Sequence, residues 1–174
     1  VVSASSSNGI YVARAFLTEL RELPSDNIIA GNTIGMNAGG DIALPNTNGI
    51  AINTAVNTTV SENVIAGNFG SGVVVANDLP WAGDDLAMGN RMTQNAIYDN
   101  GGLGIELVPD GITPNDPGDT DIGPNNLMNF PVLTSAMATP GQLIVKGTID
   151  TANPQSVRLE FFANSTPDIT EYGE

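Results

Sequence analysis

The sequence predicts an all-β protein, a parallel β-helix of about four turns followed by the start of an antiparallel β-sandwich. Three observations predict this fold. An Asn-bounded motif recurs along the chain, four Gly-led apolar segments recur beside it, and glycine and asparagine each occur 20 times among 174 residues. Gly and Asn adopt positive backbone φ angles more readily than other residues, so a chain that carries both at intervals makes many tight corners.

Two short elements define the repeat. The Asn-bounded motif N-x-I-x-x-N occurs at 27–32, 63–68 and 95–100. The Gly-led segments contain alternating apolar residues, which is typical of a strand with one face inward. Where no loop is added, the repeat is about 23 residues long, with strands too short for a sandwich but suited to the sides of a coil. The Gly-led segments begin at Gly9, Gly49, Gly72 and Gly104.

Stacking of successive repeats predicts columns of like side chains. When the three Asn-bounded motifs are aligned, their last asparagines form one column and their isoleucines another. Asn side chains in a column hydrogen-bond along the stack, as in cross-β ladders, and a column of isoleucines fills the interior. The first column contains Asn32, Asn68 and Asn100, and the second contains Ile29, Ile65 and Ile97.

Three kinds of segment interrupt the repeat. Residues 13–24 carry leucines at helical spacing and end at Pro24, which predicts a short helix or an N-terminal cap. Residues 33–48 and 76–89 are read as surface insertions, where function usually resides. Residues 109–131 are rich in Pro, Gly, Asp and Asn and lack a strand period, so they are expected to form an acidic loop that leaves the coil.

The pattern changes after Pro131. Longer apolar runs near 132–133, 143–149 and 157–162 are joined by Pro, Gly and Asn, which predicts antiparallel strands. The expected domains are therefore 1–131 and 132–174. Three or four strands make only part of a sandwich, and the chain begins with Val1, so a fragment of a longer protein is expected.

Composition excludes several function classes. The chain has 5 Lys and Arg against 19 Asp and Glu, a net charge of −14, which disfavours nucleic acid and an anionic membrane surface as partners. No apolar run approaches the roughly 18 residues of a membrane span. The chain has no Cys and no His, so it lacks the thiol nucleophile, the usual general base near neutral pH and the usual zinc ligands.

The repeats resemble those of right-handed parallel β-helix proteins, relatives of the pectin-lyase fold. The Gly-Ile-Glu-Leu stretch at 104–107, the acidic loop and the segment Gly123–Leu133 are similar to the way many large secreted bacterial members leave the coil. Residues 160–164 and 172–174 resemble the Ig-like segment that follows in them. The resemblance implies a right-handed coil, a partial Ig-like β-sandwich and a secreted or cell-surface location. The same fold also hosts polysaccharide lyases and glycoside hydrolases, so it does not decide function.

The acidic loop is a candidate Ca²⁺ site. Its carboxylate and amide oxygens are hard ligands, and glycines between them allow sharp turns. The spacing is not that of an EF-hand, and local Asx-turns that cap the coil explain the same residues equally. The candidate ligands are Asp116, Asp119, Asp121 and Asn125, with Asn115 nearby.

The insertion at 76–89 carries the candidates for carbohydrate chemistry. Gly83-Asp84-Asp85 is similar to a Gly-Asp-Asp element of β-helix polygalacturonases, and paired carboxylates serve glycoside hydrolysis. The chain departs from that family because it lacks the family's His, its Asn-Thr-Asp and its Arg-x-Lys. Trp81 offers an aromatic face for stacking on a sugar, or it packs on the edge of the coil.

The sequence therefore favours a non-catalytic structural or adhesive module whose partner is a polysaccharide or another cell-surface ligand. One alternative is a carbohydrate-active enzyme of the same fold that uses Asp84 and Asp85, with Asp41 as a further carboxylate. A second alternative is a subunit that self-associates into filaments, since open β edges pair readily.

Overall fold

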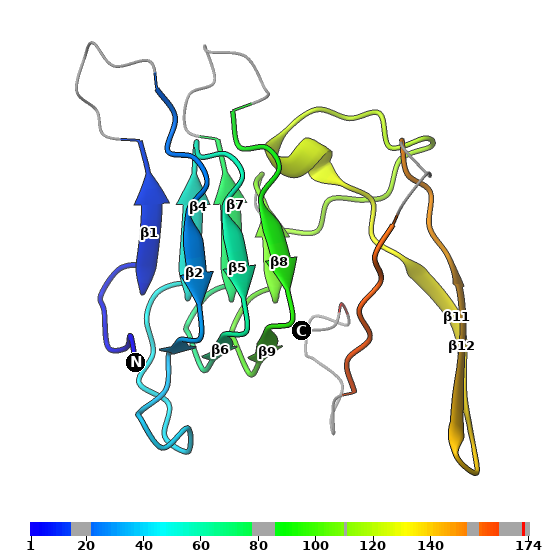
Figure 1. Ribbon diagram of the computed structural model, residues 1–174, viewed down its shortest axis with the longest axis horizontal. Coiled ribbons are helices and arrows are strands. Elements are labelled where there is room, and N and C mark those ends of the chain that lie inside the picture. The colour runs from blue at the N-terminus through cyan, green and yellow to red at the C-terminus, as the bar shows by residue number, and fades with distance from the viewer. Residues whose placement is uncertain (15–21, 78–85, 110, 153–156, 164–171, 173–174) are drawn as a thin grey trace.

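The computed structural model describes residues 1–14, 22–77, 86–109, 111–152, 157–163 and 172. In these residues the protein is all-β, and its helical content is one four-residue 3₁₀ turn, η1 (Pro124–Leu127). Strands β1 to β10 form three parallel sheets, and β11 and β12 form an antiparallel pair (Figure 1). No helix in these residues is long and apolar enough to cross a membrane.

The chain visits the three parallel sheets in turn, so strands three apart in sequence are neighbours in space (Figure 1). The first sheet has the order β1-β4-β7-β10, the second β2-β5-β8 and the third β3-β6-β9. The first sheet contains β1 (Ile10–Ala13), β4 (Ile50–Asn53), β7 (Val73–Ala76) and β10 (Ile105–Leu107). The second contains β2 (Ile28–Ala30), β5 (Thr59–Ser61) and β8 (Arg91–Thr93), and the third β3 (Thr33–Ile34), β6 (Val64–Ala66) and β9 (Ala96–Tyr98).

The four Gly-led segments form the whole first sheet, as expected from their common pattern. The register pairs Ile50 with Val73, an offset of 23 residues, which confirms the basic repeat. The glycines themselves form a column of close backbone contacts. A Cβ on Gly49 would lie 2.5 Å from the carbonyl oxygen of Gly72, and a Cβ on Gly72 would lie 2.7 Å from that of Gly104. No larger residue fits there without moving the backbone.

The predicted columns are wrong in one respect, because the first Asn-bounded motif is out of phase with the other two. The register pairs Ile29 with Val60 and Ile34 with Ile65, so residues 27–32 align with 58–63 rather than with 63–68. The reason is the position of the inserted loop. It lies between β3 and Asn46. In the round of the coil that contains β2, β3 and β4, the position equivalent to Asn68 is therefore occupied by Asn46 and not by Asn32.

Six asparagines, all but Asn32 buried, therefore form two amide ladders instead of one. In both, the side-chain oxygens of the second and third asparagines accept from the backbone and side-chain N–H groups of the asparagine before them, at 2.8–3.3 Å. Such bonds satisfy buried polar groups that would otherwise be costly. Ladder one contains Asn32, Asn63 and Asn95, and ladder two contains Asn46, Asn68 and Asn100.

The apolar core lies between the three parallel sheets. Ile34 and Ile65 are fully buried neighbours in the third sheet, and Ile50 and Ile52 contribute from the first. Val60 faces them from the second sheet and is also fully buried. Most of these strands thus supply one or two apolar side chains to the interior, which is what the short alternating segments predict.

The last part of the chain leaves the parallel sheets as a loop and then a hairpin. The described residues of 109–131, which are all but residue 110, contain no strand, as expected, and β11 (Val132–Thr139) pairs with β12 (Gln142–Thr148). Every residue of β11 is exposed, and the hairpin projects away from the parallel sheets (Figure 1). The strand predicted at 157–162 is not formed; this segment runs beside β8 and makes side-chain contacts there instead. The helix or cap predicted for 13–24 falls mainly on 15–21, outside the described residues.

Candidate functional site

Three carboxylates meet in the loop between β10 and β11. Asp116, Asp119 and Asp121 each offer an oxygen atom within 4.8 Å of the others. The loop is closed by reciprocal bonds between side-chain amides and the backbone of its two ends. Asn129 accepts from the Asp116 backbone N–H at 2.9 Å and donates to the Asp116 carbonyl at 2.8 Å. Asn115 pairs with the backbone of Phe130 in the same way, at 2.8 and 2.9 Å.

Asp119 is the buried member of the cluster, with 7% of its surface exposed. Its Oδ1 accepts from the backbone N–H of Asn129 at 2.8 Å. Its Oδ2 accepts from Ala152 N–H at 3.3 Å and from the Thr151 hydroxyl at 3.4 Å. One carboxylate therefore ties the acidic loop to the segment that follows β12.

The other two carboxylates each have one buried oxygen with no hydrogen-bond partner. These atoms are Oδ1 of Asp116 and Oδ1 of Asp121. Asp116 uses its other oxygen to accept from Thr120, at 3.0 Å from the backbone N–H and 2.8 Å from the hydroxyl, and these bonds lower its pKa. Burial raises the pKa of Asp121, and the negative charges of Asp116 and Asp119 raise it further.

This arrangement fits a hard cation. Buried polar atoms in native proteins nearly always have a partner, and one carboxylate oxygen of Asp116 and one of Asp121 lack one. The three acids within 4.8 Å also repel one another. A divalent cation would provide the missing partner and offset the repulsion. Ca²⁺ prefers carboxylate and carbonyl oxygens in flexible loops.

The structure brings together three of the four predicted ligands, and the side-chain amide of the fourth, Asn125, pairs with the backbone of Asn90. Asn125 donates its side-chain N–H to the carbonyl of Asn90 at 2.7 Å, and its oxygen accepts from Asn90 N–H at 3.0 Å. Its amide thus continues a column that contains Thr58, whose N–H donates to the Asn90 side-chain oxygen, and Asn27, whose side chain donates to the Thr58 hydroxyl. Asn125 therefore caps the end of the second sheet. This agrees with the alternative that polar residues of this loop cap the coil instead of binding a metal.

Sequence reasoning missed two residues of this region. Asn129 holds the loop closed, and Asp150 accepts from Gly118 N–H at 2.9 Å. Asn129 gave one usable signal, because it follows Asn125 and Asn126 in a run that begins with Pro124 and ends before Pro131. Asp150 gave none, since it comes from beyond β12 and reaches the loop only through the fold.

The candidates for carbohydrate chemistry are placed only in part. Trp81, Asp84 and Asp85 lie outside the described residues. Asp41 is described and exposed, in a turn where its side chain accepts from the Asn37 amide at 2.8 Å. The bond orders that turn, which also contains the antiparallel bridge between Met36 and Ala43.

Comparison of the chain with protein-family models, with curated proteins and with solved structures finds no match.

Proposed function

We propose that this chain is a non-catalytic structural module of a secreted or cell-surface protein, stabilised by Ca²⁺ in its acidic loop. In this proposal the three parallel sheets form a right-handed parallel β-helix of the pectin-lyase type, and β11 and β12 begin an Ig-like β-sandwich. The helix serves as a rigid support that presents its inserted loops to a polysaccharide or another cell-surface ligand.

One observation carries the proposal. Within the described residues, every buried side-chain nitrogen or oxygen has a hydrogen-bond partner except Oδ1 of Asp116 and Oδ1 of Asp121. The side-chain amides of the buried asparagines therefore all take part in hydrogen bonds within the protein. The two exceptions lie in the acidic cluster, where a bound cation would satisfy both.

The position of the cluster supports a structural role for the cation. The loop that contains it connects β10 to β11, and Asp119 also contacts Thr151 and Ala152 beyond β12. A cation at this point would hold the parallel sheets and the hairpin in a fixed relation. The ligands would be Asp116, Asp119 and Asp121, completed by backbone oxygens or water.

Calcium titration of thermal unfolding tests the site. We expect a higher Tm in millimolar CaCl₂ than in EDTA, because a ligand that binds only the folded state stabilises it, by about 2.7 kcal/mol at a hundredfold excess over Kd. Isothermal titration calorimetry of the same protein gives Kd directly. A Tm that is the same in calcium and in EDTA would refute the calcium site.

A matched pair of variants locates the effect. Asp121→Asn removes one ligand charge at the cluster, whereas Asp41→Asn removes the same charge from an exposed turn. We expect the first to abolish the calcium-dependent rise in Tm and the second to leave it unchanged. Equal responses in both variants would show that calcium acts through general screening of the −14 charge.

A panel of polysaccharides, scored for binding and for released products, tests the non-catalytic part of the proposal. Binding without products would support the adhesive module. Products that disappear in Asp84→Asn or Asp85→Asn would instead make the protein a glycoside hydrolase or lyase. Absence of both, with concentration-dependent growth in particle size by light scattering, would favour self-association.

A further inference from the structure

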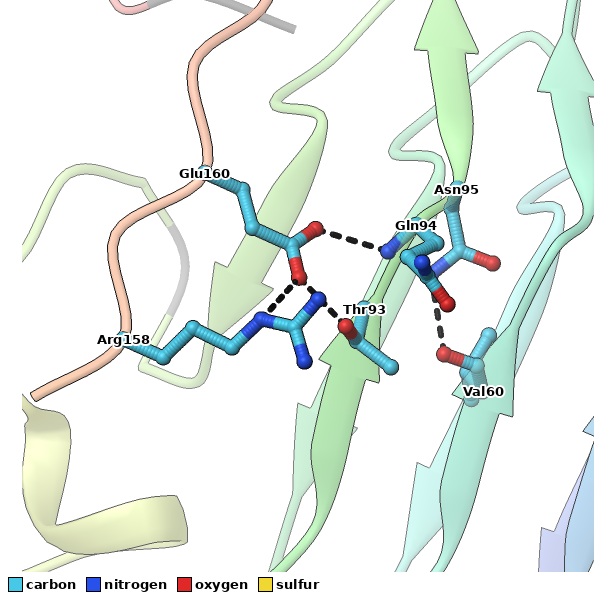
Figure 2. Close-up of polar contacts among 6 residues, drawn as sticks. All are labelled: Val60, Thr93, Gln94, Asn95, Arg158 and Glu160. Carbon is cyan, nitrogen blue, oxygen red and sulfur yellow. Dashed lines mark hydrogen bonds and ion pairs between the residues drawn. The ribbon is translucent and has the colours of Figure 1, made fainter.

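The second sheet ends at β8, and side chains from later in the chain cover both ends of that strand. Asn125 pairs with Asn90, the residue before β8. Glu160 accepts a hydrogen bond from the Thr93 hydroxyl and another from the backbone N–H of Gln94, the residue after β8, at 2.7 Å (Figure 2). The Asn90 and Gln94 backbone N–H groups are equivalent to the ones that, in earlier strands of the sheet, donate to the next strand along the stack: Thr58 N–H donates to Asn90 and Gly31 N–H to Ser61.

The Glu160 carboxylate occupies the place of a missing strand. Ala30, Ser61 and Thr93 are equivalent in the register of β2, β5 and β8, so Gly31 and Gln94 occupy equivalent corners. Gly31 N–H donates to the carbonyl of Ser61 in the next strand, at 3.2 Å. Gln94 N–H has no further strand of this sheet within the described residues, and it donates to Oε2 of Glu160 instead.

The contact is electrostatically matched. Arg158, on the same segment as Glu160, forms an ion pair with its Oε1 at 2.9 Å (Figure 2). The bonds from Thr93 and Gln94, then Arg158 and Arg91, lower the pKa of Glu160. The rest of the segment contributes exposed apolar side chains rather than a packed core: Val157, Leu159, Phe161 and Phe162 are 43–59% exposed.

We propose that the edge of β8 is a docking surface for an extended segment that presents a carboxylate, and that residues 157–163 occupy it as a detachable strap held by Glu160. Within the described residues, the hydrogen bonds between this segment and the end of β8, the last strand of the second sheet, come from the Glu160 side chain. The backbone of residues 157–163 forms no strand pairing with β8 or with the rest of that sheet. This inference is independent of the calcium site.

The strap is expected to respond to pH with a defined sign. The ionised carboxylate is the form that accepts from Gln94 and Thr93, and its pKa lies below the ordinary value of 4.5. The strap therefore stays attached at any pH above the lowered pKa of Glu160, and it detaches as the pH falls through that pKa. Glu160→Gln removes the charge at neutral pH, where the other carboxylates keep theirs.

Amide hydrogen exchange of the full chain, measured by NMR at neutral pH, tests the proposal. We expect the Gln94 amide to exchange about tenfold faster in Glu160→Gln than in the unsubstituted protein, because a charge-assisted hydrogen bond is lost. The matched control is Glu22→Gln, which removes an exposed carboxylate outside the strap and leaves Gln94 unchanged.

The amide of Val60 shows whether the fold itself is intact. Val60 lies one strand inward from β8 and is fully buried, and its carbonyl accepts from the Asn95 side chain at 2.9 Å (Figure 2). We expect its exchange to be the same in both variants. Unchanged exchange at Gln94 in Glu160→Gln would overturn the proposal. Equal acceleration at Gln94 and Val60 would also overturn it, since Glu160 would then support the whole stack.

Discussion

Replacing Asn63 with alanine tests whether the amide ladders hold the stack together. Asn63 is 1% exposed, and its side chain takes part in five hydrogen bonds. Its N–H group donates to the Ile29 carbonyl at 2.9 Å, and its oxygen accepts from Asn32 N–H at 2.9 Å. Truncation removes this side-chain partner from both backbone groups. A buried group that loses its partner costs roughly 1–3 kcal/mol, so we expect a total loss of about 4 kcal/mol.

Asn32→Ala is the matched control in the same ladder. Asn32 lies at the end of the ladder, and its side chain only donates, to Ala30 and Asn63. After truncation the Asn63 oxygen still accepts from the Asn32 backbone N–H, so we expect a loss of about 1 kcal/mol. Urea unfolding followed by circular dichroism gives both free energies of unfolding. Losses within 1 kcal/mol of each other, a margin of about one net hydrogen bond, would refute the reasoning.

Three further predictions concern packing and charge. Gly72→Ala should lower the free energy of unfolding by about 1–3 kcal/mol in urea titrations, because its Cβ would meet the Gly104 carbonyl at 2.7 Å; a neutral effect would contradict the close contact. Ile65→Ala should cost about 2–5 kcal/mol in the same assay, whereas Ile28→Ala, at a side chain 75% exposed, should cost much less. In EDTA, Asp121→Asn should raise Tm, because the raised pKa of Asp121 means that its charge destabilises the folded state above that pKa; a lower Tm would contradict this sign.

The repeat architecture was predictable because its signal is local. A Gly followed by alternating apolar residues identified all four strands of the first sheet, and their spacing gave the 23-residue register between Ile50 and Val73. The phase of the first Asn-bounded motif was not predictable in the same way. Its sequence matches the later motifs, but Asn32 pairs with Asn63, and only the position of the inserted loop before Asn46 reveals the shift.

The sequence predicted corners with positive φ at glycine and asparagine, but other residue types also occupy such corners. Gly31 occupies one corner at φ 68°, and Glu62 and Gln94 occupy the equivalent corners at φ 56°. Neither Glu nor Gln signals a left-handed conformation in sequence. The surrounding ladder imposes it, because a departure would break the bonds on both sides.

The sequence identified the acidic loop as the place of a candidate metal site, but it did not identify all of the residues that meet there. Asp116, Asp119 and Asp121 lie close in sequence and meet in space. Asn125, four residues after Asp121, belongs to a different contact because its turn directs its amide toward Asn90. The attachment of residues 157–163 to β8 depends on contacts between Glu160 and residues 66 and 67 positions earlier, which no local pattern reveals.

The first sheet keeps one register across very different lengths of intervening chain. Ile10 pairs with Ile50 at an offset of 40 residues, Ile50 with Val73 at 23, and Val73 with Ile105 at 32. Loop closure becomes costlier by only about 0.6 kcal/mol for each doubling of length. Strand geometry and loop content are thus specified separately, so foreign peptides could be grafted at the turn around Asp41 without redesigning the scaffold beneath it.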